Sequence, residues 1–122
     1  ADYMNDSQLS YFKSLLELQK ETIISGIAKL KKDLIITDKS ADQADAATNH
    51  ELQQLELKRM NREASLLNKI NDSLRLIKSG DYGYCEDTGE EIGIKRLLAR
   101  PTSTLCVEAK ELQEFRERTV GI

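Results

Sequence analysis

The chain has 122 residues, of which 39% are hydrophobic and 32% charged, and this mixture favours long exposed helices over a thick globular core. Its net charge of −3 gives no general attraction to nucleic acid, so duplex binding by bulk electrostatics is disfavoured. No apolar run approaches the length of a membrane span and no signal peptide is visible, although the chain starts at Ala1 rather than at a Met.

The first helical pattern extends from about Ser7 to Ile36. Asn5 or Asp6 is suited to cap its N-terminus. Apolar residues recur every seven positions along it, and three more widen the same stripe, as in a coiled-coil seam: Leu9, Leu16, Ile23 and Leu30, with Phe12, Ile27 and Leu34.

A turn and a second helix follow. Residues 37–40 lose the apolar pattern and contain turn formers, and a second helical pattern runs from about Ala41 or Asp42 to Ser79, before Gly80. Its apolar seam consists of one seven-residue ladder and the ladder adjacent to it: Met60, Leu67 and Leu74, with Ile70 and Ile77. Two such helices with a short connection fold back antiparallel. The alternative is one part of an ordinary helical bundle, but no third long helix is available to cover the pair. We therefore predict a mainly α protein in which residues 1–80 form a long antiparallel coiled-coil hairpin, with its tip near residues 37–47.

Residues 81–122 have a different composition, in which a segment rich in turn formers is followed by a few apolar residues. Ile92, Ile94, Leu97 and Leu98 provide a small apolar set. After Pro101 we expect a last helix over about residues 105–118, with three residues on its buried side: Leu105, Leu112 and Phe115. This segment is interpreted as a small, degenerate zinc-finger-like domain with a C-terminal helix.

This domain is called degenerate because each of its two cysteine motifs is incomplete. Cys85-x-x-Thr88 and Cys106-x-x-Ala109 have the outline of two CxxC knuckles, each without its second thiol. Since Thr is a poor zinc ligand and Ala is none, we expect no bound zinc. The alternatives are two unrelated core cysteines, or a zinc-finger fold that survives without its metal, and we favour the second. Free cysteines also suit a reducing compartment, so a cytoplasmic protein is expected.

Acidic and basic residues are segregated along the second helix. Residues 41–56 contain four acids and no base, whereas residues 57–78 contain six bases. Asp42 and Asp45 are three apart at the tip, where acids also suit the positive end of a helix dipole. Arg62, Leu66 and Lys69 form one stripe by their spacing, for which a merely solvated face is the simpler explanation. Converging cations such as Arg100 and Lys110 are needed if the stripe is to bind phosphate.

On particular motifs the chain resembles the DksA/TraR family of RNA polymerase secondary-channel regulators. The motifs are YGYC, GEEIG and RLxARPTxxLC within residues 81–106, and DQADAA at the tip, which fits the family's DxxDxA pattern without the usual Pro. The similarity covers nearly the whole chain. Its cysteine pattern resembles the branch of the family that lacks a complete zinc site, and this suggests a zinc-independent paralogue.

The resemblance implies a function and a set of residues. It implies a regulator, not an enzyme, whose tip enters the secondary channel of bacterial RNA polymerase and modulates promoter open complexes in the stringent response. Asp42, Asp45 and Ala47 are the implied tip residues. The implied site for the effector ppGpp, formed where the regulator meets the polymerase, comprises Arg62, Leu66, Lys69, Arg100, Glu108 and Lys110. A structural or chaperone-like coiled-coil protein is the alternative; sequence-specific DNA binding is not expected. Target promoters and oligomeric state stay open.

Overall fold

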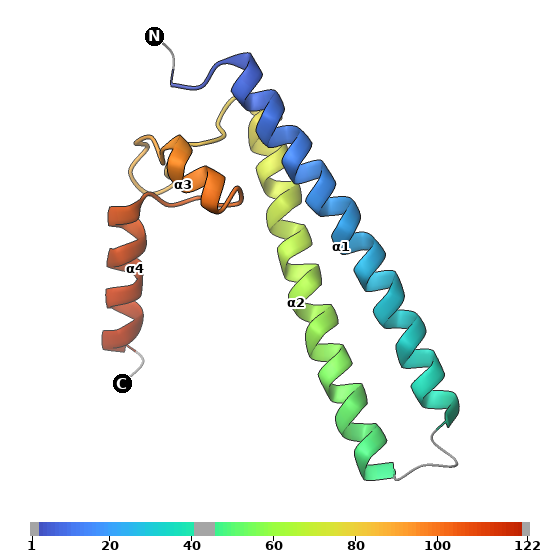
Figure 1. The fold of residues 1–122 in the computed structure, drawn as a ribbon. Helices are drawn as coiled ribbons and strands as arrows, with labels where there is room; N and C mark the ends of the chain where they lie inside the picture. The colour runs from blue at the N-terminus through green and yellow to red at the C-terminus, as the bar shows by residue number, and fades with distance from the viewer. Residues whose placement is uncertain (1–2, 41–45, 121–122) are drawn as a thin grey trace. The chain divides into compact units, whose positions relative to one another are not determined.

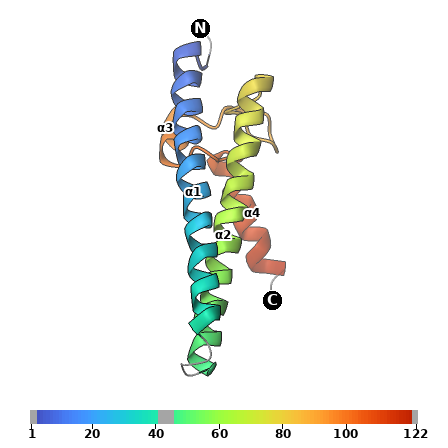
Figure 2. The same cartoon turned by 90° about the vertical axis from the view of Figure 1, so that its right-hand side faces the viewer.

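The structure, a computed structural model, describes residues 3–40 and 46–120. Four helices follow one another along the chain: α1 (Asp6–Ser40), α2 (Ala46–Ser79), α3 (Ile94–Ala99) and α4 (Val107–Val120). The two long helices lie side by side in both ribbon views (Figure 1, Figure 2), so the predicted antiparallel hairpin is confirmed. None of the described helices is both long and apolar enough to cross a membrane.

Asn5 determines where α1 begins. Its side-chain oxygen accepts a hydrogen bond from the Gln8 amide at 2.8 Å, and the Gln8 side chain accepts one from the Asn5 amide at 2.9 Å. This reciprocal pair satisfies two amides that the first turn of a helix leaves without partners. Of the two caps that the sequence offered, the structure uses Asn5.

The predicted turn over residues 37–40 is wrong. The α1 helix continues through all four residues to Ser40, and α2 begins at Ala46. These four residues include neither Gly nor Pro, so extending an existing helix through them costs little. The connection falls on residues 41–45, which lie outside the described residues.

The chain divides into two compact units. The arm unit is Glu17–Asn71, and the globular unit is Ala1–Leu16 together with Asp72–Ile122. Within the arm unit, Ile23 and Ile70 are buried and lie on the predicted seam, which confirms the heptad pattern there. The division into two domains at residues 1–80 and 81–122, which the sequence suggests, stays a prediction.

The globular unit is held together by a small, mostly apolar core. Phe12 and Leu16 of α1 are 1% and 0% exposed, and Leu97 of α3 is 0% exposed. The Tyr82 ring lies 5.7 Å from the Phe12 ring, and its hydroxyl donates a buried hydrogen bond to the Pro101 carbonyl at 2.7 Å. The residues after α2 are therefore anchored to the start of α1 by both apolar and polar contacts.

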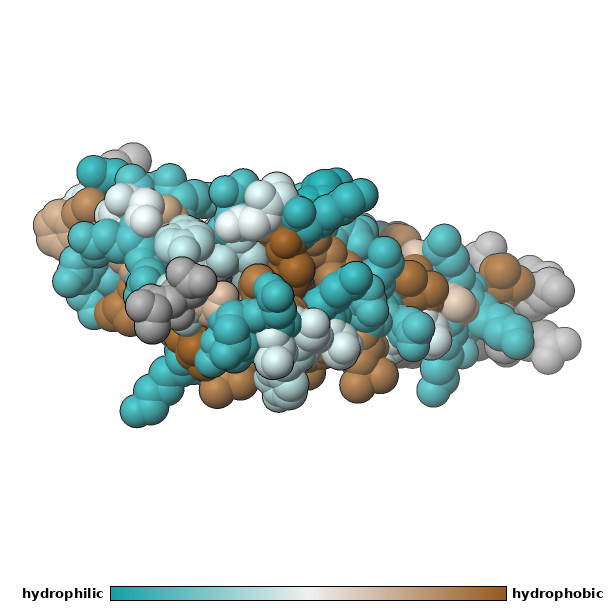
Figure 3. Space-filling model, turned by 90° about the horizontal axis from the view of Figure 1, so that it is seen from above, coloured by the Kyte–Doolittle hydropathy of each residue, from teal (hydrophilic) through white to brown (hydrophobic). Residues whose placement is uncertain are grey.

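The interpretation of α4 from the sequence is partly wrong. Leu105 is buried as expected, but Leu112 and Phe115 are 48% and 56% exposed. Ala109 is buried near the start of α4, whereas every described side chain from residue 111 onward is exposed. Only the first turn of α4 thus belongs to the core. Figure 3 shows hydrophobic residues in patches among hydrophilic ones, in keeping with such exposed apolar side chains.

Candidate functional site

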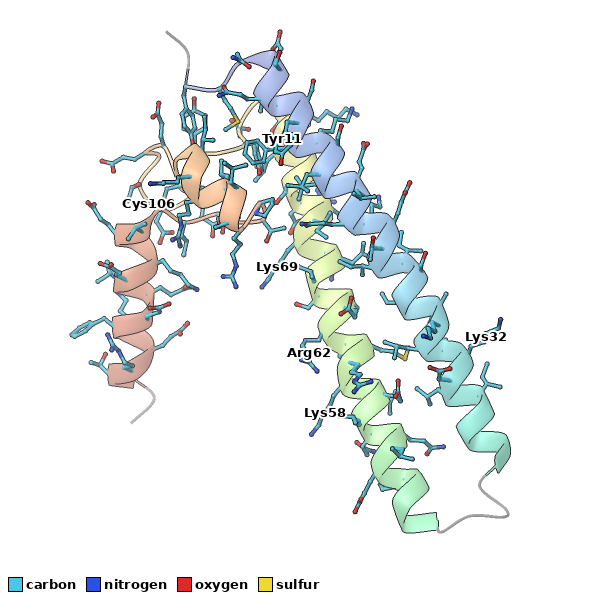
Figure 4. The ribbon with its side chains drawn as sticks, in the orientation of Figure 1. Tyr11, Lys32, Lys58, Arg62, Lys69 and Cys106 are labelled. Carbon is cyan, nitrogen blue, oxygen red and sulfur yellow. The ribbon has the colours of Figure 1, made fainter. Side chains whose placement is uncertain are left out.

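The basic stripe predicted on α2 is present in the arm unit. Arg62 and Lys69 are exposed, and Leu66 between them is 40% exposed. In Figure 4 the side chains of Lys58, Arg62 and Lys69 all point to the same side of α2. Because residues at i, i+4 and i+7 share one helix face, this stripe could approach an extended anion along the helix axis.

The cations of this stripe, and Lys58 one turn before it, have no acidic partner within the described part of the chain. Among the described residues, Lys58, Arg62 and Lys69 form no ion pair. By contrast, the Arg59 guanidinium lies 3.7 Å from a carboxylate oxygen of Glu56 in the same helix. An exposed cation without a protein partner keeps its full charge for a ligand and loses no internal contact when it binds one.

The remaining predicted ppGpp residues belong to the globular unit. Arg100 is exposed at the end of α3, where its amide donates to the Arg96 carbonyl at 2.9 Å. Glu108 is exposed in the first turn of α4, and the Lys110 amino group donates to the Gln113 side chain at 3.1 Å. These three residues therefore have a defined local structure within the globular unit. Arg62, Leu66 and Lys69 belong to the arm unit.

Three of the four positions of the degenerate zinc site are buried, and the fourth, Thr88, is exposed. Cys85, Cys106 and Ala109 are 2%, 7% and 6% exposed. The Thr88 hydroxyl lies 3.8 Å from the Cys106 sulfur, and it accepts a hydrogen bond from the Glu90 amide at 3.2 Å. Backbone bonds close the knuckle around Cys85, whose amide donates to the Glu90 carbonyl at 2.7 Å.

The surroundings of the Cys85 thiol favour its ionised form. Burial raises the pKa of Cys85, but hydrogen bonds from the Thr88 hydroxyl and from the amides of Cys106, Thr88 and Asp87 outweigh this effect. The net result lowers the pKa of Cys85 to about 7. The knuckle therefore still presents the array of donors that stabilises a thiolate, although Thr88 stands where a second thiol would be.

The predicted tip cannot be assigned a geometry. Asp42 and Asp45 lie outside the described residues, and α2 begins one residue after Asp45. Ala47 is within α2, but the position of its side chain is likewise outside the description. The roles of all three residues therefore stay predictions.

Reasoning from the sequence missed a contact between the start of the chain and the zinc-finger-like segment. The Tyr3 hydroxyl accepts a hydrogen bond from the Gly93 amide at 2.6 Å, and its ring packs edge-on against Tyr84 with the centroids 5.5 Å apart. No periodicity could reveal a contact between residues 90 positions apart. The one feature of the sequence that could have indicated this contact is the presence of three tyrosines in two short segments, at positions 3, 82 and 84.

Comparison with known proteins finds two family models along the chain. The N-terminal domain of the DnaK suppressor protein DksA matches residues 8–77, and the prokaryotic dksA/traR C4-type zinc finger matches residues 80–115. Together they cover both long helices and the segment with the two cysteines.

Individual relatives agree with these matches. The chain is 46% identical over 120 residues to the RNA polymerase-binding transcription factor DksA of Caulobacter vibrioides, covering 95% of this chain and 82% of the relative. It is 38% identical over 123 residues to the protein of that name from Escherichia coli K12, covering 98% and 80%. The solved structure of transcription factor DksA2 from Pseudomonas aeruginosa matches with a TM-score of 0.89 and 44% identity, over 95% of this chain and 90% of that one.

The zinc-finger match corrects the expectation that the chain binds no zinc. Residues 80–115 match a C4-type zinc finger as a whole, and this points to zinc binding. The expectation considered only the identities of the four ligand positions, whereas the match rests on the entire segment. Those positions do not fit a closed four-thiolate site, because two of them are Thr88 and Ala109. Within the part of the chain that the structure describes, no group of three or more Cys, His, Asp or Glu side chains is arranged so that it could hold a metal ion.

Proposed function

The chain belongs to the DksA/TraR family, and from that premise we propose that it is a transcription regulator that binds bacterial RNA polymerase through the secondary channel. The observation that carries the proposal is the 46% identity, over 95% of the chain, to a relative named as an RNA polymerase-binding transcription factor. A protein with this partner acts in the cytoplasm. Its role is regulatory rather than enzymatic, and it needs no sequence-specific contact with DNA.

The geometry of the arm unit is suited to insertion into a channel. Within it, α1 from Glu17 to Ser40 extends about 36 Å at a rise of about 1.5 Å per residue. An antiparallel pair of helices of this length satisfies its own backbone hydrogen bonds, so it needs no further layer to remain folded. Such a pair can hold the residues at its tip well away from the opposite end of the arm.

In this proposal Asp42, Asp45 and Ala47 act at the polymerase active centre. Two carboxylates would change the electrostatic potential there, and they would influence metal-bound or basic groups of the polymerase without any chemistry of their own. The small side chain at position 47 would allow close approach of the tip backbone.

We further propose that ppGpp is the effector, held by the regulator and the polymerase together. Arg62 and Lys69 supply exposed cations that no described acid neutralises, and Leu66 lies between them. Arg100, Glu108 and Lys110 complete the proposed set from the globular unit. A hydrogen bond between charged groups contributes about 1.5–3 kcal/mol, so the loss of one cation should weaken the response to ppGpp about 10- to 150-fold in effector concentration.

The test is transcription in vitro from a ribosomal RNA promoter, with and without ppGpp. It compares the wild-type chain with the double variant Asp42→Asn, Asp45→Asn, and uses Glu51→Gln, an exposed acid on α2, as the matched control. We expect the double variant to bind polymerase but to lose its effect on transcription, while the control retains both. Equal activity of all three proteins would contradict the proposed role of the tip.

One observation favours a second function, a structural or chaperone-like arm that packs against another helix. Leu52, Leu55 and Leu57 on α2 are 47%, 43% and 43% exposed, and exposed apolar residues can form a helix interface. The single variant Asp45→Asn separates the two functions. In a regulator, the variant keeps its affinity for polymerase and loses its transcriptional effect, whereas in a packing arm the substitution changes little.

A further inference from the structure

A small pocket in the globular unit is surrounded by aromatic side chains. Its volume is about 210 Å³, and its lining residues are Tyr3, Met4, Leu9, Gly80, Tyr82 and Tyr84. All of them belong to the globular unit. None of these lining residues is Lys or Arg, so the described lining supplies no cation of its own to the rings.

Hydrogen bonds hold two of the three phenol groups in place. The Tyr82 hydroxyl donates to the Pro101 carbonyl at 2.7 Å, and the Tyr3 oxygen accepts from the Gly93 amide at 2.6 Å. The Tyr3 and Tyr84 rings meet edge to face, with centroids 5.5 Å apart and an interplanar angle of 64°. Because the rings are fixed before any ligand arrives, binding would cost little side-chain entropy.

The electrostatic field around these rings favours a positive guest. The face of an aromatic ring is negative because of its quadrupole. Burial raises the pKa of Tyr3, and the nearby carboxylate of Glu91 raises it further, which indicates negative charge close to the phenol. Glu91 is held there by an antiparallel bridge to Tyr84.

We propose that this pocket receives the side chain of an arginine or lysine from the protein partner of this chain. A guanidinium or ammonium group on an alkyl stem fits a small cavity that has aromatic walls, the thioether of Met4 and a carboxylate nearby. The inference rests on the proposed function only for the identity of that partner, which is RNA polymerase. It adds a docking contact in the globular unit, separate from the tip and from the basic stripe of α2.

The first experiment tests the pocket without polymerase. Methylguanidinium is titrated into the full chain, and the ring protons of the four tyrosines are followed by NMR. We expect saturable shifts at Tyr3, Tyr82 and Tyr84, with little change at Tyr11, which is 54% exposed, does not line the pocket and is labelled in Figure 4. Shifts of equal size at all four tyrosines, or no saturation, would overturn the proposal.

Two substitutions at Tyr84 show whether the ring itself binds the cation. Tyr84 is 43% exposed, so Tyr84→Leu should fold, and circular dichroism would verify this. Tyr84→Leu removes the aromatic face, and we expect it to weaken methylguanidinium binding about 2- to 30-fold. Tyr84→Phe keeps the face and should bind like the wild type. Equal losses in the two variants would mean that the hydroxyl, rather than the ring, makes the contact.

The second experiment measures the affinity of the same variants for RNA polymerase, with Tyr11→Leu as the matched control. Loss of affinity in Tyr84→Leu alone, by about 2- to 30-fold, supports docking of a basic side chain in the pocket. Unchanged affinity of Tyr84→Leu, in a chain that does bind polymerase, overturns that docking. If the wild-type chain fails to bind polymerase, the proposed function itself fails, and the methylguanidinium titration still decides whether the pocket binds cations.

Discussion

Gly83 is the position where a single added methyl group should disturb the globular unit most clearly. Its φ of +92° lies in a region that residues with a Cβ rarely adopt. A Cβ there would lie 2.7 Å from the terminal methyl of Met4 and 3.1 Å from a ring carbon of Tyr3. Normal contacts between carbon atoms are about 3.5–4.0 Å, so at least one of these neighbours must move.

Two contributions determine the expected cost of Gly83→Ala. The unfavourable φ costs about 1–2 kcal/mol. The crowding costs about 1–3 kcal/mol. The Met4 methyl can move easily because it ends a flexible side chain, but the Tyr3 ring is held by its 2.6 Å hydrogen bond to Gly93. We therefore expect Gly83→Ala to lower the free energy of unfolding by about 2–5 kcal/mol.

Gly89→Ala is the matched control, because it separates backbone strain from crowding. Gly89 also has a positive φ, +75°, but a Cβ there would have no neighbour within 4 Å. The measurement is urea unfolding followed by tyrosine fluorescence, which is readily interpreted because the chain has four Tyr and no Trp. If Gly83→Ala proves no more destabilising than Gly89→Ala, the close packing of Met4 and Tyr3 against Gly83 is refuted.

Four further predictions concern other parts of the fold. Burial raises the pKa of Tyr82 above the usual value of 10.0. The contribution of the neutral Tyr82 phenol to the free energy of unfolding is therefore complete below pH 10 and is lost as the pH rises further. Urea midpoints between pH 9 and 11 should fall for the wild type and fall less for Tyr82→Phe. At neutral pH, Tyr82→Phe should lower the free energy of unfolding by about 1–3 kcal/mol in the same assay, because the Pro101 carbonyl loses its buried donor. Leu16→Ala should cost about 2–5 kcal/mol in thermal unfolding, since the side chain is fully buried, and a loss below about 1 kcal/mol would contradict its place in the core. Phe115→Ser, at a 56% exposed position, should change the unfolding free energy by less than about 0.5 kcal/mol; a larger loss would mean that this part of α4 is covered.

The hairpin could be predicted from the sequence because its signals are local and repeated. Heptad spacing identified Leu16, Ile23 and Ile70 as seam residues, and all three are buried. The Asn5 cap was likewise readable from a short segment. The exact position of the turn could not be predicted, because Thr37, Asp38 and Ser40 are weak helix formers whose conformation depends on the helix that precedes them.

The globular unit was predicted only in outline, because its structure depends on contacts between distant residues. The two cysteine motifs indicated a knuckle, and the family match identified it as a zinc-finger segment, against the expectation of no zinc. The apolar spacing of Leu112 and Phe115 suggested burial, but spacing alone cannot tell whether another element is present to cover a helix face. The tip, the ppGpp residues and the function assigned to them remain predictions, supported by the motifs and the exposed basic stripe.

The bond between Tyr3 and Gly93 joins residues 90 positions apart, and this separation has a consequence for the order of folding. During synthesis the first residues leave the ribosome long before their partners exist, so they must wait without their final contacts. Closing such a large loop by chance is entropically costly and slow. Pairing of the two long helices would shorten the effective loop by bringing its ends together. The hairpin would then fold first and act as the template on which Tyr3 and Gly93 finally meet.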